Sequence, residues 1–197
     1  MFWNKLNTCC CILLFSTQLF SEIRSKHQEN FNEGARFKSL KCEADNKTIF
    51  VKYCFLKPVS RKVVTLNTGL KFLVPYNRPF LFQAILYYRY GTIFREIIDT
   101  KKHDICEAFD GGNPNLLVKL IFDMINSRSP GILHKCPYIG DWDLRNFTAN
   151  TDLLDRATML FPRGIYRFDF YFYSHDVNTL NTSTMLESKT SLKETFG

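Results

Sequence analysis

The stretch PFLFQAILYYRY, residues 79–90, decides the fold class. Apolar residues occupy every second position of it: Phe80, Phe82, Ala84, Leu86, Tyr88 and Tyr90. Gln83 and Arg89 stand at positions between them. Alternation over this length is typical of a β-strand that has one face in a core and the other in solvent.

Four further segments alternate in the same way. They are residues 49–55, 64–74, 93–98 and 166–172. In residues 64–74, Leu66, Leu70 and Phe72 stand at every second position and so lie on one face of the expected strand. The polar Thr68 interrupts this apolar face. In residues 166–172, Phe168 and Phe170 lie on the same face of the expected strand as Tyr166. Many short strands at this spacing predict an all-β, two-sheet antiparallel sandwich.

One segment has the spacing of a helix instead. Leu120, Ile121 and Met124 belong to an apolar face that runs over residues 114–126, with Asn113 as the expected cap and Pro114 at the first position. We expect one helical insertion there, at about 114–126, which either covers an edge of the sandwich or acts as a lid. After residue 173 the chain becomes polar, which predicts an uncertain last strand and a polar tail over 174–197.

The N-terminus predicts a secreted, extracellular protein. Residues 1–21 combine Lys5, an apolar stretch over 9–15 and small residues up to Ser21, which is typical of a signal peptide. The alternative is a buried N-terminal helix. The polar residues that follow, 22–34, favour the signal.

The cysteine count agrees with secretion. Of seven cysteines, three lie in the predicted signal, and the mature chain keeps Cys42, Cys54, Cys106 and Cys136. An even number in an oxidising compartment predicts two disulfides, and the residues alone leave all three pairings open. Three glycosylation sequons begin at Asn46, Asn146 and Asn181.

Composition excludes several classes of protein. The chain has 197 residues, 45% of them hydrophobic and 15% aromatic, which excludes wholesale disorder. No apolar run reaches the roughly 18 residues of a membrane-spanning helix. The net charge is +7, but the basic residues are scattered, so we expect no nucleic-acid partner.

The sequence predicts no enzyme. The pairs His103-Asp104 and His175-Asp176 are neighbours in sequence, and neighbours on a strand point to opposite faces. No nucleophile elbow, zinc-binding H-E-x-x-H or phosphate-binding loop occurs. We therefore expect no catalytic residue, no cofactor and no metal.

Three motifs carry a resemblance to a known family. They are Asp104-Ile105-Cys106, then Cys136-Pro137-Tyr138 with Gly140, Trp142 and Leu144, and Phe161-Pro162-x-Gly164-x-Tyr166. This pattern resembles insect secreted proteins classed as a domain of unknown function, which include the CheB-like chemosensory proteins. That family is similar to the ganglioside-activator branch of the lipid-recognition (ML) superfamily. The resemblance covers residues 36–173 and is most specific over 104–168.

The resemblance implies a fold and two disulfides. The fold is an immunoglobulin-like β-sandwich whose two sheets separate around a lipid-sized apolar cavity. The implied pairs are Cys106–Cys136 and Cys42–Cys54, and a turn at Asp45-Asn46 suits the second pair if it closes a hairpin. The ganglioside activator ties its first strand to its last with a disulfide. This chain has no cysteine after Cys136, so we expect no disulfide to hold its final strand.

The combined expectation is a secreted protein that binds a lipid or other small hydrophobic molecule and carries or presents it, with chemosensation as the role that the resemblance implies. Expected partners are that ligand and a membrane surface or receptor. The alternative is an extracellular protein–protein interaction module with a filled core. The resemblance implies a cavity between the sheets, with a volume of about 300–1,000 Å³ as is usual for ligand pockets. The spacing of apolar residues predicts that these residues face inward, and we expect them to form the cavity wall: Leu66, Leu70, Phe72, Phe80, Phe82, Leu86, Tyr88, Leu120, Ile121, Met124, Phe168 and Phe170.

Overall fold

The structure, a computed structural model, describes residues 35–112, 114–149 and 163–188. The predicted signal peptide, the expected helix cap Asn113 and the end of the tail lie outside the described residues. In none of the helices within these ranges is there a stretch that is both long and apolar enough to cross a membrane.

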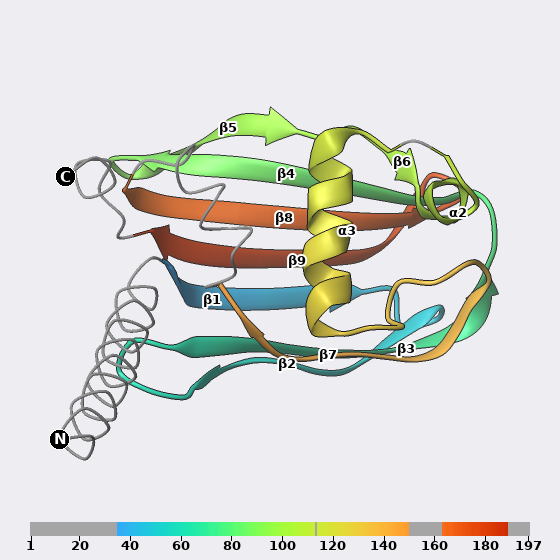
Figure 1. The fold of residues 1–197 in the computed structure, drawn as a ribbon, viewed down its shortest axis with the longest axis horizontal. Coiled ribbons are helices and arrows are strands. Elements are labelled where there is room, and N and C mark those ends of the chain that lie inside the picture. The colour runs from blue at the N-terminus through green and yellow to red at the C-terminus, as the bar shows by residue number, and fades with distance from the viewer. Residues whose placement is uncertain (1–34, 113, 150–162, 189–197) are drawn as a thin grey trace, which may run out of the picture. The chain divides into compact units, whose positions relative to one another are not determined.

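Two antiparallel sheets form the fold, and the predicted all-β sandwich is confirmed (Figure 1). The large sheet consists, in spatial order, of β1 (Ala35–Ala44), β9 (Val177–Ser188), β8 (Gly164–Ser174), β4 (Phe80–Tyr90) and β5 (Ile93–Asp99), with the short β6 (His103–Asp104) also paired to β4. The small sheet consists of β2 (Ile49–Pro58), β3 (Val64–Tyr76) and β7 (Tyr138–Thr148).

The helical insertion contains two helices, α2 (Ile105–Phe109) and α3 (Leu116–Arg128). The expectation of one helix starting at Pro114 is therefore corrected. The cap of α3 is Asn115, whose side-chain oxygen accepts a hydrogen bond from the Val118 amide at 2.9 Å. Because the Asn115 side chain satisfies a free amide of the first turn, the helix begins at Leu116 and not at Pro114.

Helix α3 completes the wall that the small sheet leaves open. Figure 1 shows it running across the strands of the large sheet. Three strands cannot cover the inner face of five, so the remaining apolar surface needs another partner. Phe122 of α3 supplies it, since its ring centroid lies 5.5 Å from that of Phe82 on β4. Val118, on the same helix face, is fully buried.

Strand β9 lies inside the large sheet. Its Leu180 pairs with Ala44 of β1 on one side and with Phe172 of β8 on the other. This strand lies in the segment after residue 173 where a last strand was expected, and it ends at Ser188. Because β9 has a hydrogen-bonded neighbour on both sides, it is held in place without a cysteine of its own.

Both disulfides implied by the resemblance are confirmed. Cys42–Cys54 has a Cα–Cα distance of 6.2 Å, and Cys106–Cys136 has one of 5.4 Å. The hairpin expected around the first pair is wrong, because β1 and β2 belong to different sheets. The chain changes sheet at the turn where the Thr48 amide donates to the Asp45 carbonyl. The disulfide thus joins edge strands of the two sheets.

The core consists of two packed clusters at opposite ends of the strands. One contains a group of aromatic rings that includes Phe72, Tyr76, Phe80 and Tyr138. The other contains Leu66, Leu86, Leu144, Phe147 and Tyr166. The middle of the sandwich lies between the two clusters.

Candidate functional site

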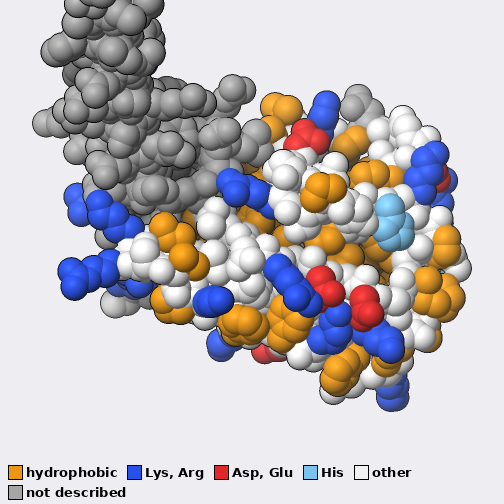
Figure 2. Space-filling view, turned by 60° about the horizontal axis from the view of Figure 1, so that its bottom comes forward, with side chains coloured by type: hydrophobic (Ala, Val, Ile, Leu, Met, Phe, Trp, Pro, Cys, Tyr) orange, Lys and Arg blue, Asp and Glu red, His pale blue; other side chains and the backbone are white. Residues whose placement is uncertain are grey.

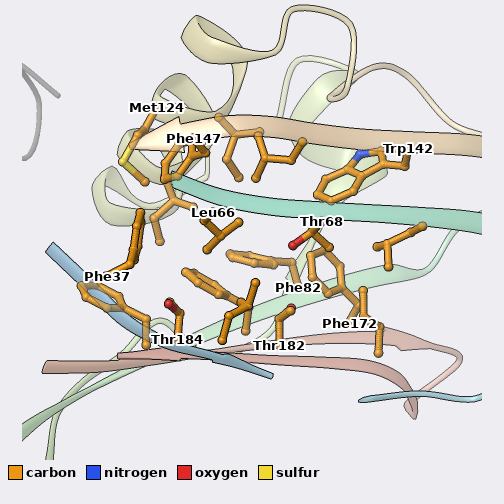
Figure 3. Close-up of a pocket in the computed structure, with 18 of the residues that line it drawn as sticks. Phe37, Leu66, Thr68, Phe82, Met124, Trp142, Phe147, Phe172, Thr182 and Thr184 are labelled. Atoms are coloured by element: carbon orange, nitrogen blue, oxygen red, sulfur yellow. The ribbon is translucent and has the colours of Figure 1, made fainter. Parts of the chain in front are cut away.

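A cavity of about 130 Å³ lies between the two sheets and α3 (Figure 3). Strands of both sheets and the helix contribute to its wall. The lining residues are Phe37, Leu40, Leu66, Thr68, Leu70, Phe82, Ile121, Met124, Ile125, Trp142, Leu144, Phe147, Phe168, Phe170, Phe172, Leu180, Thr182, Thr184 and Leu186.

Small side chains at inward positions explain where the cavity lies. Thr68 stands between Leu66 and Leu70 on the inward face of β3. On β9, Thr182 and Thr184 stand between Leu180 and Leu186. Threonine is smaller than leucine or phenylalanine, so the facing sheets fill their ends and leave the middle open.

The wall is almost wholly apolar and carries no charged side chain. Two of its four polar side chains are already hydrogen-bonded to the backbone. The Trp142 indole donates to the Ile132 carbonyl at 3.0 Å, and the Thr184 hydroxyl donates to the Ser39 carbonyl at 3.0 Å.

Two tyrosines of the end clusters, outside the cavity wall, are also neutral. Burial raises the pKa of Tyr138 and of Tyr166 to about 12, so both phenols keep their protons at physiological pH.

The volume limits what fits without rearrangement. A dry apolar cavity of about 150 Å³ is known to bind benzene, so this one has room for a molecule of about that size. It is smaller than the expected 300–1,000 Å³, and a longer chain needs the wall to move. Met124 of α3 is the most adaptable lining residue, because its unbranched thioether fits many shapes.

The residues expected in the wall fall into three groups. The first lines the cavity: Leu66, Leu70, Phe82, Ile121, Met124, Phe168 and Phe170. Phe72 and Phe80 instead border a void of about 10 Å³ at the aromatic end.

The third group, Leu86, Tyr88 and Leu120, borders neither space. Leu86 is buried in the other end cluster. Tyr88 packs on Tyr166 with a centroid distance of 5.0 Å. Leu120 is half-buried on α3, off the face that lines the cavity.

Sequence reasoning missed the contributions of β1, β7 and β9. In β7 the inward residues Trp142 and Leu144 alternate, but the next one is Phe147, because the register with β3 shifts there. Arg145 and Asn146 are the two β7 residues inside that shift, and Asn146 has a positive φ of 52°. The alternation of Leu180, Thr182, Thr184 and Leu186 was a usable signal for β9.

The three sequon asparagines differ in exposure. Asn46 and Asn146 are exposed, as attachment of a glycan requires. Asn181 lies within β9, is only partly exposed, and has its side-chain oxygen enclosed without a hydrogen-bond partner. Glycosylation therefore stays a prediction, better suited to the first two sites.

The described residues hold no group of three or more potential metal ligands among His, Cys, Asp and Glu. His103 contacts backbone and amide groups, with its Nε2 at 2.8 Å from both the Thr100 carbonyl oxygen and the Asn115 Nδ2. On the face in Figure 2, the Lys and Arg side chains are spread among apolar and acidic ones. The cavity is thus the candidate functional site.

Comparison with known proteins gives a structural likeness but no sequence match. No protein-family model matches the sequence, and no curated protein matches it. Among solved structures, the chain is similar to a Niemann-Pick type C2 protein from Japanese carpenter ant, with 9% sequence identity, 78% of this chain and 91% of that chain covered, and a TM-score of 0.26.

Proposed function

We propose that the protein is a secreted carrier that holds a lipid or other small hydrophobic molecule in the cavity between its sheets. The observation that carries the proposal is the cavity of about 130 Å³ with an apolar, uncharged wall. Space of this kind costs packing energy, since the lining atoms lose dispersion contacts that a guest would restore. In an insect, chemosensation is the use that the sequence resemblance implies.

Two disulfides support secretion, because such bonds persist in oxidising compartments. The alternative, an interaction module with a filled core, is less well supported, because the middle of this core is open. Contact with a membrane or receptor during ligand transfer belongs to the same proposal, with α3 as the element that would move.

The test is ligand-dependent stability combined with a cavity-filling variant. Protein secreted from cultured cells is analysed by native mass spectrometry for a co-purified small molecule. Stripped protein is then titrated with ethylbenzene and with dodecan-1-ol while Tm is recorded. A ligand that binds only the folded state raises Tm with concentration.

Leu66→Phe places a larger side chain in the cavity and should abolish most of that rise. The matched control is Leu116→Phe, at a residue of α3 that is 73% exposed and does not line the cavity. If wild-type protein carries no small molecule and neither compound raises Tm, the carrier function is wrong. An equal rise in wild type and Leu66→Phe places binding elsewhere and also contradicts the proposal.

A further inference from the structure

Two hydroxyl groups face the cavity without a hydrogen-bond partner among the residues that the structure describes. They belong to Thr68 of the small sheet and Thr182 of the large sheet. Figure 3 shows the two side chains on opposite walls, both directed into the cavity. Thr68 is only 4% exposed, so bulk water does not solvate its hydroxyl.

An unsatisfied hydroxyl in apolar surroundings is costly, whereas valine has nearly the same shape and carries no such cost. Thr68 is also the residue that interrupts the apolar parity of β3. Thr184 provides a contrast within the same wall, because its hydroxyl is used by the Ser39 carbonyl. The hydroxyls of Thr68 and Thr182 therefore remain available to a guest.

We propose that the preferred guest is a small neutral molecule with one oxygen function, an alcohol, ketone, aldehyde or ester, that hydrogen-bonds to Thr68 and Thr182. This inference rests on the proposed carrier function and specifies its ligand class. A hydroxyl both donates and accepts, so either a carbonyl or an alcohol oxygen satisfies it.

Ionised ligands are disfavoured for a physical reason. The wall contains no Lys, Arg or His side chain that would pair with a carboxylate. Transfer of an unpaired carboxylate into an apolar site costs far more than the hydrogen bonds from two neutral hydroxyls return. The cavity therefore discriminates against the anions of carboxylic acids of the same size.

The experiment compares three molecules of matched size: benzyl alcohol, ethylbenzene and benzoate at pH 7. Their Kd values are measured by calorimetric titration or by ligand-dependent Tm on the full secreted chain. We expect wild-type protein to bind benzyl alcohol at least as well as the more hydrophobic ethylbenzene, and benzoate at least about 100-fold more weakly. Thr68→Val and Thr182→Val should each weaken benzyl alcohol about fivefold and leave ethylbenzene unchanged or tighter.

Thr68→Ser keeps the hydroxyl and should retain most of the affinity for benzyl alcohol. The matched control is Thr179→Val on β9, because the Thr179 hydroxyl donates to the Phe172 carbonyl at 3.2 Å and the residue does not line the cavity. Its Kd for benzyl alcohol should lie within about twofold of wild type. The inference is overturned if ethylbenzene binds and neither valine variant changes the ratio of the two Kd values, as when a trapped water satisfies both hydroxyls. Tight binding of benzoate overturns it as well. Failure of all three molecules to bind counts instead against the carrier function itself.

Discussion

The ring of Tyr53 on β2 lies directly against the α-carbon of Gly69 on β3, its paired residue across the strands. A side-chain carbon built on Gly69 would be 2.6 Å from the Tyr53 Cζ atom and 2.8 Å from the Asp143 Oδ1 atom. The Tyr53 hydroxyl donates to that same carboxylate at 2.8 Å, and Arg145 Nε donates to the hydroxyl oxygen at 2.8 Å. These contacts of Tyr53 link all three strands on the outer face of the small sheet.

Gly69→Ala should destabilise the protein by about 1–3 kcal/mol, because the added methyl overlaps the ring and forces it to move. The free energy of unfolding in urea measures this. In a Tyr53→Ala background the same substitution should cost clearly less, since the ring is gone. An equal cost in both backgrounds would show that the close approach is not the cause.

The fold class followed from period-two alternation, and the five strands expected from it over 49–98 and 166–172 all exist. Strands β1, β7 and β9 were harder to predict for local reasons. β7 contains a register shift near Asn146, whose backbone amide is held by the Asn67 side chain at 3.0 Å. β9 alternates with threonine in place of large apolar residues, so its pattern is weak although it lies inside the sheet.

The cavity wall was only half predictable, because parity tells which face of a strand is inward but not where along the strand space remains. Phe72, Phe80 and Leu86 are all inward and buried, yet they pack into the two end clusters. The open stretch lies where Thr68 meets Thr182 and Thr184 across the sheets. That pairing joins residues more than a hundred positions apart and depends on the tertiary structure.

Protonation of Asp99 at low pH should lower the stability of the folded protein. A hydrogen bond from the Lys101 ammonium at 2.7 Å is the largest cause that lowers the pKa of this carboxyl to about 2, with a further one from Gln83 at 2.8 Å. Because the folded-state pKa is lower than the unfolded one, the stabilisation is complete above about pH 4 and is lost as the pH falls towards 2. Lys101 is 79% exposed, so solvent screening leaves about 1 kcal/mol.

Asp99→Asn should therefore lose about 1 kcal/mol at pH 7 and match wild type near pH 2, as measured by urea unfolding across this range. Asp176→Asn is the control, since that carboxylate is 77% exposed. A constant difference between Asp99→Asn and wild type from pH 7 to pH 2 would assign the effect to packing rather than to charge.

The start of α3 depends on the Asn115 cap. Its side-chain oxygen accepts from the Val118 amide at 2.9 Å, while its amide nitrogen donates to the Thr100 carbonyl at 3.3 Å. Asn115→Ala removes these two hydrogen bonds and the 2.8 Å contact with His103 Nε2, and it should cost about 1–2 kcal/mol of unfolding free energy. Asn126→Ala, at an exposed position on the same helix, should change stability by less than about 0.5 kcal/mol. Equal effects of the two variants would contradict the cap.

Substitution by valine at two threonines of the cavity wall should change the free energy of unfolding in opposite directions. Thr68→Val removes an unpartnered hydroxyl from an apolar wall and should stabilise the ligand-free protein by about 1 kcal/mol. Thr184→Val breaks the 3.0 Å bond to the Ser39 carbonyl and should destabilise it by about 1 kcal/mol. Thermal and urea unfolding of stripped protein measure both, and the same sign for the two variants would mean that Thr68 has a partner after all, such as a bound water.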